Sequence, residues 1–134
     1  MDINELVTIA KKAAKNAYAP YSGYKVGAVA VCGDKLYTGC NVENASYGLT
    51  MCAERVAIYK AVTDGCRKID MVVVYAANSI PYPCGACLQV MAEFCDDTCQ
   101  IILADENKIE KYSFAELLPR RFSKDALQFS SKHI

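Results

Sequence analysis

Three cysteines and one glutamate follow the pattern Cys-x-Glu and, further along the chain, Cys-x-x-Cys. Cys84 and Cys87 are separated by two residues, so both sulfurs can bind one metal ion with little backbone strain, and Cys52 can supply a third ligand. Three protein ligands leave the fourth tetrahedral position of a zinc ion open, which is typical of a catalytic site. Glu54 stands two residues after Cys52, where its carboxylate can face an activated water and transfer protons. The pattern therefore predicts a catalytic zinc site.

The chain has eight cysteines in all, which is a high number for its length. An even number in a small secreted domain would suggest disulfides. The N-terminal residues are charged and lysine-rich, unlike a signal peptide, so we expect a cytoplasmic location in which thiols stay reduced. Free thiols packed as small hydrophobic side chains are therefore the expectation for the five cysteines outside the pattern, Cys32, Cys40, Cys66, Cys95 and Cys99.

A second metal site is not expected. Cys95 and Cys99 are separated by a short polar turn and have no further ligands near them in the sequence. The single histidine, His133, stands next to the end of the sequence, where we expect a solvated side chain. Any metal site must therefore be built without histidine.

Length and charge exclude several classes of protein. The 134 residues suit a single domain, 1–134, that is long enough for one hydrophobic core. Fifteen basic and fifteen acidic residues give a formal net charge of zero, without the basic excess that nucleic-acid-binding proteins usually carry. The longest apolar stretches, 26–32 and 71–77, are too short to span a membrane. We expect no nucleic-acid or membrane partner.

The apolar pattern predicts an alternation of helices and strands. Helical spacing covers residues 4–18, with Asp2 or Asn4 as cap, and a hairpin follows at 24–32 and 35–42. A second helix is expected at 52–63 after a Thr50 cap, and a third at 84–95. The remaining elements are strands at 69–77, 100–104 and 109–112 and a short helix at 114–118 capped by Ser113. This order predicts a layered α/β domain.

These residues carry a family resemblance. The run from Asn41 to Arg55, followed by Pro83 to Cys87, resembles the signature of the small homotetrameric zinc-dependent cytidine deaminases, in the cytidine/deoxycytidylate deaminase superfamily. Residues 21–28 and 116–119 look like the same family, so the resemblance covers residues 18–122. It implies a three-layer α-β-α domain with a mixed central sheet of about five strands.

The resemblance also implies an activity. Cytidine and deoxycytidine would be deaminated hydrolytically to uridine and deoxyuridine plus ammonia, as in pyrimidine salvage. One zinc ion per subunit would be held by Cys52, Cys84 and Cys87, with Glu54 as the proton shuttle. Arg55 would hydrogen-bond the ligand thiolates. The subunits would form a homotetramer that shares its sites between neighbours.

Further residues would contact the substrate if the resemblance holds. The aromatic ring of Tyr24 would pack near the pyrimidine, and Asn41 and Glu43 would hold a ribose hydroxyl. The backbone N–H of Ala53 would bind the base carbonyl, and the carbonyl of Tyr82 would accept from the amine. Two aromatic residues would reach the site across a subunit interface, Phe122 by stacking on the base and Tyr47 by a less defined contact.

Three other functions fit parts of the pattern. A deaminase of nucleoside antibiotics would share the metal site but not the whole run from Asn41 to Arg55. A polynucleotide-editing deaminase would need a binding surface that the neutral charge does not provide. A structural zinc module could use Cys84, Cys87, Cys95 and Cys99, and would then have a closed site that is indifferent to Glu54.

Overall fold

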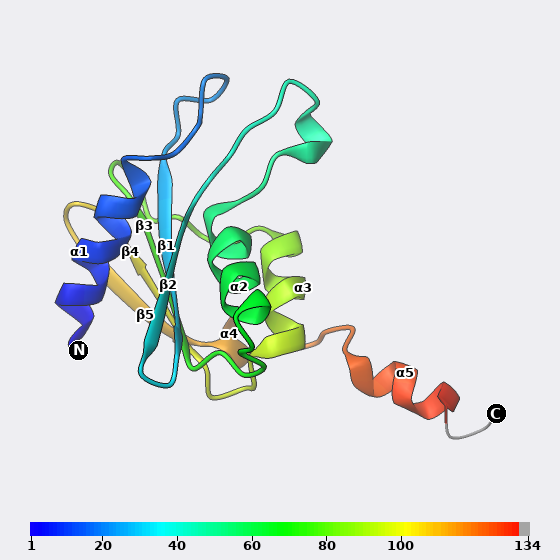
Figure 1. The fold of residues 1–134 in the computed structure, drawn as a ribbon. Helices are drawn as coiled ribbons and strands as arrows, with labels where there is room; N and C mark the ends of the chain where they lie inside the picture. The colour runs from blue at the N-terminus through cyan, green and yellow to red at the C-terminus, as the bar shows by residue number, and fades with distance from the viewer. Residues whose placement is uncertain (132–134) are drawn as a thin grey trace.

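A computed structural model describes residues 1–131 and is built on a five-stranded sheet (Figure 1). The strand order is β2-β1-β3-β4-β5, and only β3 and β4 run parallel. The strands are β1 (Val26–Cys32), β2 (Lys35–Cys40), β3 (Met71–Ala76), β4 (Gln100–Ala104) and β5 (Ile109–Ser113). The expectation of a mixed sheet of about five strands is confirmed.

Helices cover both faces of this sheet (Figure 1). Helix α1 (Ile3–Ala14) lies on one face, while α2 (Ala53–Thr63) and α3 (Gly85–Phe94) lie side by side on the other. The short helix α4 (Phe114–Leu117) follows β5, and α5 (Lys124–Ser131) extends away from the rest of the chain. A single 3-10 turn, η1 (Tyr47–Leu49), interrupts the long loop before α2. The domain is the three-layer α-β-α arrangement that the sequence predicts.

Strand β3 shows why the central strands are apolar throughout. Val72 and Val74 pack in the cluster under α2 and α3, whereas Val73 and Tyr75 pack against α1. Successive side chains of a strand point to opposite faces, so a strand covered on both faces needs apolar residues at every position.

Two glycines let the helices lie close to the hairpin of β1 and β2. A Cβ atom at Gly27 would lie 1.9 Å from the carbonyl oxygen of Ala10 in α1. A Cβ atom at Gly39 would lie 2.6 Å from the carbonyl oxygen of Ala53 and 2.6 Å from the amide nitrogen of Ala57, both in α2. The lack of a side chain at Gly39 thus sets how deeply the first turn of α2 sits on the sheet.

The helix boundaries differ from the prediction at three places. The first helix ends at Ala14, since the N–H of Tyr18 donates to the Asn41 carbonyl and Tyr18 pairs in extended form with Val42. Thr50 does not cap α2: Cys52 occupies the N-cap, and the Thr50 hydroxyl accepts from the Asn44 N–H instead. Helix α5 was not predicted at all. The Asp2 and Ser113 caps are confirmed.

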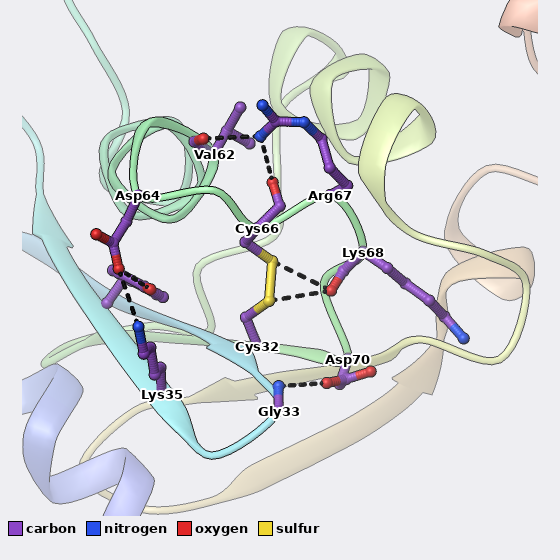
Figure 2. The surroundings of a disulfide bond; sticks show 10 residues. Cys32, Gly33, Lys35, Val62, Asp64, Cys66, Arg67, Lys68 and Asp70 are labelled. Carbon is purple, nitrogen blue, oxygen red and sulfur yellow. Dashed lines mark hydrogen bonds and ion pairs between the residues drawn. A yellow bond between two sulfur atoms is a disulfide. The ribbon is translucent and has the colours of Figure 1, made fainter.

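A disulfide joins Cys32 to Cys66 (Figure 2), with their Cα atoms 6.4 Å apart. Free thiols were the wrong expectation for these two residues. Cys32 is the last residue of β1, and Gly65, with φ at +103°, turns the chain after α2 so that Cys66 comes back to the end of that strand. The expectation is confirmed for the other three cysteines outside the predicted metal site, since free thiols are found at Cys40, Cys95 and Cys99.

Side chains around the disulfide also fasten the end of α2 (Figure 2). The Arg67 guanidinium donates to the carbonyl oxygens of Val62 and Cys66 at 2.9 and 3.0 Å. The carboxylate of Asp70 accepts from the Gly33 N–H at 2.7 Å and so holds the hairpin turn. The far end of α2 is therefore fixed to the sheet by covalent and polar contacts together.

Two remaining expectations concern the chain as a whole. Within residues 1–131, no helix combines the length and apolar character that crossing a bilayer requires. His133 lies outside the described residues.

Candidate active site

The three cysteines of the predicted metal site meet at the N-terminal ends of two helices. Cys52 is the N-cap of α2, Cys84 is the N-cap of α3, and Cys87 lies in the first turn of α3. The Cys52 and Cys84 Sγ atoms are 3.9 Å apart, those of Cys84 and Cys87 are 3.6 Å apart, and all three lie within 4.8 Å of one another. The structure brings together the three ligands that the sequence predicts.

The geometry of the sulfurs fits a zinc ion. Sulfurs at the corners of a tetrahedron, each about 2.3 Å from zinc, are about 3.8 Å apart, which is close to the spacing observed. Cys87 is buried, Cys52 is half-buried and Cys84 is exposed, so the group is open on one side. Within residues 1–131 this group has three members and includes neither Cys95 nor Cys99, so the closed four-cysteine module is not formed.

The backbone and one cation compensate the charge of the sulfurs. Both helices present their N-terminal ends to the group, and the partial positive charge there stabilises thiolates. The Arg55 Nη2 atom donates to the Cys52 Sγ at 3.4 Å, while its buried Nε has no hydrogen-bond partner. A hydrogen bond from the Cys87 thiol, reinforced by Arg55, lowers the pKa of Cys52 to about 5 against the opposing effect of burial.

Glu54 lies beside the sulfurs in a buried position. Its side chain is 5% exposed, and burial raises its pKa to about 7. The charge of Cys52 also raises this pKa, whereas Cys87 and Arg55 lower it. A bound cation would favour the ionised carboxylate. Glu54 is not among the three ligands, so it can accept and return protons there.

Asn41 is buried at the end of β2 and braces the start of β1. Its Oδ1 accepts from the Val26 N–H at 2.9 Å, and its Nδ2 donates to the Tyr24 carbonyl at 2.7 Å. One N–H and one lone pair of the amide remain for another partner. Tyr24 itself is 43% exposed and lies two residues before the start of β1.

Glu43 holds a loop and lines a pocket. Its Oε1 accepts from the N–H groups of Tyr21 and Ser22 at 3.0 and 3.1 Å, and its Oε2 accepts from the Ser22 hydroxyl. These hydrogen bonds, that of the Ser22 hydroxyl above all, lower the pKa of Glu43. A pocket of about 360 Å³ lies here, lined by Tyr21, Ser22, Glu43, Tyr47 and Thr50. The rings of Tyr21 and Tyr47 meet edge to face, with centroids 6.1 Å apart.

Comparison with known proteins identifies the family. Residues 1–103 match the family described as the cytidine and deoxycytidylate deaminase zinc-binding region. The chain belongs to this family. A cytidine deaminase of Sporosarcina psychrophila is 44% identical over 98% of this chain and 99% of its own length, and one of Halalkalibacterium halodurans is 43% identical over 92% and 96%. The crystal structure of a Burkholderia pseudomallei cytidine deaminase superposes with a TM-score of 0.87 at 42% identity, covering 91% of this chain and 100% of that one.

Membership of the deaminase family makes the chain a hydrolytic enzyme. Two more of the predicted residues have the following positions in the structure. Ala53 is the first residue of α2 and is fully buried next to Cys52. Phe122 is 62% exposed in the segment between α4 and α5, where its carbonyl accepts from the Gln89 amide at 2.8 Å. Its ring is thus exposed, and within residues 1–131 no contact brings it to the sulfurs.

A larger hollow lies away from the deaminase centre. It has a volume of about 680 Å³ and lies between the end of α3 and the segment 121–125. Acidic and basic side chains line it together, including Asp96, Asp97, Arg67 and Arg121, and none of the three cysteines does. The metal-binding group, and not this hollow, marks the site, because it brings candidate metal ligands together with a buried carboxylate.

Some side-chain contacts of this region were missed in the sequence. Ser22 contacts Glu43 through both its N–H and its hydroxyl, and Tyr82 contacts Glu110 on β5. The Ser22 contact follows from the turn at 19–23, a signal the sequence offers. No local pattern connects Tyr82 with Glu110, because they meet only when the sheet has formed.

Proposed function

We propose that this deaminase converts cytidine and deoxycytidine to uridine and deoxyuridine with release of ammonia, as a step of pyrimidine salvage. One observation carries the proposal: three sulfurs at zinc-binding distances beside a buried carboxylate that is not a ligand. The names of the relatives, which are cytidine deaminases along nearly their whole length, support the choice of substrate.

Cys52, Cys84 and Cys87 would hold one zinc ion per subunit, and Arg55 would donate to the thiolate of Cys52. When bound, zinc supplies the Lewis acidity that makes water nucleophilic near neutral pH. Three protein ligands would leave the fourth position of the zinc ion to that water, and Glu54 would act as its base.

Glu54 would carry the protons of the reaction. It takes a proton from water as the C4–O bond forms and delivers it to N3 of the base. It then takes the second proton from that oxygen and gives it to the amine as the C4–N bond breaks, so that ammonia leaves. Its buried position keeps bulk water from competing for these protons.

The substrate would be held by groups around the pocket that Glu43 lines. Glu43 would bind a ribose hydroxyl together with the remaining N–H and lone pair of the Asn41 amide. The Tyr24 ring would pack near the pyrimidine. The Ala53 N–H would bind the base carbonyl and the Tyr82 carbonyl the amine. Since Glu43 also holds the loop of Tyr21 and Ser22, substrate binding and loop order would be coupled.

A homotetramer with shared sites would complete this arrangement. Exposed large apolar side chains favour a partner surface, and those of this chain include Tyr24, Tyr47, Leu49, Tyr82 and Phe122. Tyr47 and Phe122 would reach the site of a neighbouring subunit. We expect this enzyme in the cytoplasm, as a single catalytic domain.

The test combines metal content with an absorbance assay. We expect about one zinc per chain, and turnover of cytidine and deoxycytidine that disappears on chelation and returns with Zn²⁺. A panel with a nucleoside antibiotic and a single-stranded oligonucleotide separates the alternatives. Zinc-loaded protein that leaves both nucleosides unchanged would overturn the proposal, and turnover of the antibiotic or oligonucleotide alone would replace it with the corresponding deaminase.

A further inference from the structure

Cys84 is the most exposed of the three cysteines and is carried by an irregular segment. Residues 78–84, between β3 and α3, have no regular secondary structure, and Cys84 ends this segment as the N-cap of α3. Packing therefore holds Cys84 less firmly than the buried Cys87. The position of its sulfur depends on whatever fixes the residues before it.

Packing of apolar residues and one side-chain hydrogen bond fix this segment. Ile80 and Pro81 are buried, and Pro83 limits the backbone directly before Cys84. Between them Tyr82 is 61% exposed, so packing contributes little to holding it. Its hydroxyl instead donates to Oε1 of Glu110 at 2.8 Å, across to the edge strand β5.

The Glu110 carboxylate also contacts two side chains that are close to it in the sequence. Its Oε1 also accepts from the Tyr112 hydroxyl at 2.6 Å, and its Oε2 pairs with Lys108 at 3.2 Å. Its side chain is only 22% exposed, although Lys108 is solvated. The hydrogen bond from Tyr112 and that from Tyr82 lower the pKa of Glu110, so the carboxylate is ionised at neutral pH.

The geometry places this carboxylate on the functional side of the sheet. Glu110 is opposite Leu103 in the register of β4 and β5, and Leu103 packs in the cluster under α2 and α3. Tyr112, two residues on, packs against the same cluster. Glu110 thus stands at the outer edge of the face that carries the three sulfurs. A hydrogen bond to an ionised acceptor is stronger than a neutral one and fixes direction as well as distance.

We propose that Glu110 is a positioning residue which, through the Tyr82 hydroxyl, holds the segment 78–84 so that Cys84 keeps its place as a metal ligand. The inference rests on the proposed function only in taking Cys52, Cys84 and Cys87 as the zinc ligands. Glu110 touches neither the metal position nor the substrate in this arrangement; it acts through Tyr82 alone.

The experiment measures zinc release to a chromogenic chelator from the purified, zinc-loaded protein. In Y82F, which loses only the hydroxyl, we expect release about tenfold faster than in wild type, at the lower end of what loss of an outer contact costs a metal site. Glu110→Leu should release zinc as fast as Y82F does. Glu110→Gln keeps a hydrogen-bond acceptor and should release zinc more slowly than Glu110→Leu. The double variant Y82F/Glu110→Leu should be no faster than either single one, because both break one contact.

Lys108→Met is the matched control, because it removes the exposed partner of the other carboxylate oxygen and leaves the Tyr82 contact intact. It should release zinc at the wild-type rate. The unfolding temperature of each zinc-free protein is measured in parallel, because a merely structural role would lower it and the proposed role would not.

Either of two results would overturn the inference: zinc release from Y82F within twofold of the Lys108→Met rate, or faster release that follows a lowered unfolding temperature of the zinc-free protein. Turnover of cytidine is recorded separately. If wild-type protein holds zinc but leaves cytidine unchanged, the proposed function fails while the comparison of release rates still decides the role of Glu110.

Discussion

At the scale of single residues, the proposed site divides its tasks between groups that would hold a metal and one group that would move protons. Cys52, Cys84 and Cys87 lie at distances that suit zinc, and Glu54 lies beside them without joining them. Arg55 contributes a positive charge to the sulfurs from within the same helix. Replacing a ligand and replacing Glu54 should therefore have different consequences.

Glu54→Gln should keep zinc and fold but lower kcat for cytidine by about 10²–10⁴-fold, since an amide cannot take up a proton. Steady-state kinetics and metal content of the purified variant measure this. Glu93→Gln, an exposed position on α3, serves as the control and should turn over cytidine at the wild-type rate. Wild-type turnover by Glu54→Gln would exclude the assigned role.

Asn41→Leu should destabilise the protein as well as weaken substrate binding. The change leaves the Val26 N–H and the Tyr24 carbonyl without their partner at a buried position, at a cost of about 2–3 kcal/mol in the free energy of unfolding. Urea denaturation measures the loss. Asn107→Leu, in an exposed turn, should change stability by about 0.5 kcal/mol at most. Equal stability of the two variants would mean that the Asn41 amide does not brace β1.

At the scale of elements, helix α2 decides where the catalytic groups lie. Its first turn carries Cys52, Glu54 and Arg55 and rests on β2 through Gly39. Its last turn is tied to β1 by the disulfide between Cys32 and Cys66. The helix is thus fixed at both ends, which suits a site that needs several groups within bonding distance.

Gly39→Ala should lower both stability and activity, because the added Cβ meets the backbone of α2 at 2.6 Å and forces the helix away from the sheet. We expect a loss of about 1–3 kcal/mol in the free energy of unfolding, with reduced kcat. Gly48→Ala is the control for stability, since no atom lies within 4 Å of its added Cβ. Thermal unfolding of both variants tests the expectation. A Gly39→Ala protein as stable and active as wild type would show that α2 tolerates the shift.

At the scale of the whole molecule, exposed aromatic side chains support the proposed association of subunits. Phe122 is 62% exposed and far from the sulfurs in sequence, and Tyr47 is 76% exposed in the long loop before α2. Exposed large apolar groups favour association. The proposed tetramer would use them to complete each site.

Mixing two inactive variants tests whether sites are shared. Glu54→Gln lacks the proton shuttle, and Phe122→Ala lacks the aromatic ring proposed to stack from a neighbour. When the two proteins are unfolded together and refolded, mixed tetramers should contain sites with both wild-type groups, so activity should exceed the sum of the separately refolded parents. Activity equal to that sum would place Phe122 in its own subunit's site or outside any site. Light scattering should give four times the chain mass.

The sequence predicts most of the fold and the metal-binding group, because both depend on local patterns. The Cys84-x-x-Cys87 spacing and the position of Glu54 after Cys52 act within one helical turn, and the apolar run of β3 reflects burial on both faces. Contacts between distant segments escape such reasoning. Cys32 and Cys66 are 34 residues apart and meet only through the path of α2, and helix α5 has only eight residues, too few for a repeated helical spacing of apolar residues to reveal it.

The bond between Cys32 and Cys66 closes residues 32–66 into a covalent ring that contains both Cys52 and Glu54. The stretch of this ring most open to a protease is 44–49, where every side chain is exposed. A single cut there would open the ring without separating its halves. On a gel without reductant the cleaved chain should keep its full mass, and two fragments should appear only after a reducing agent is added.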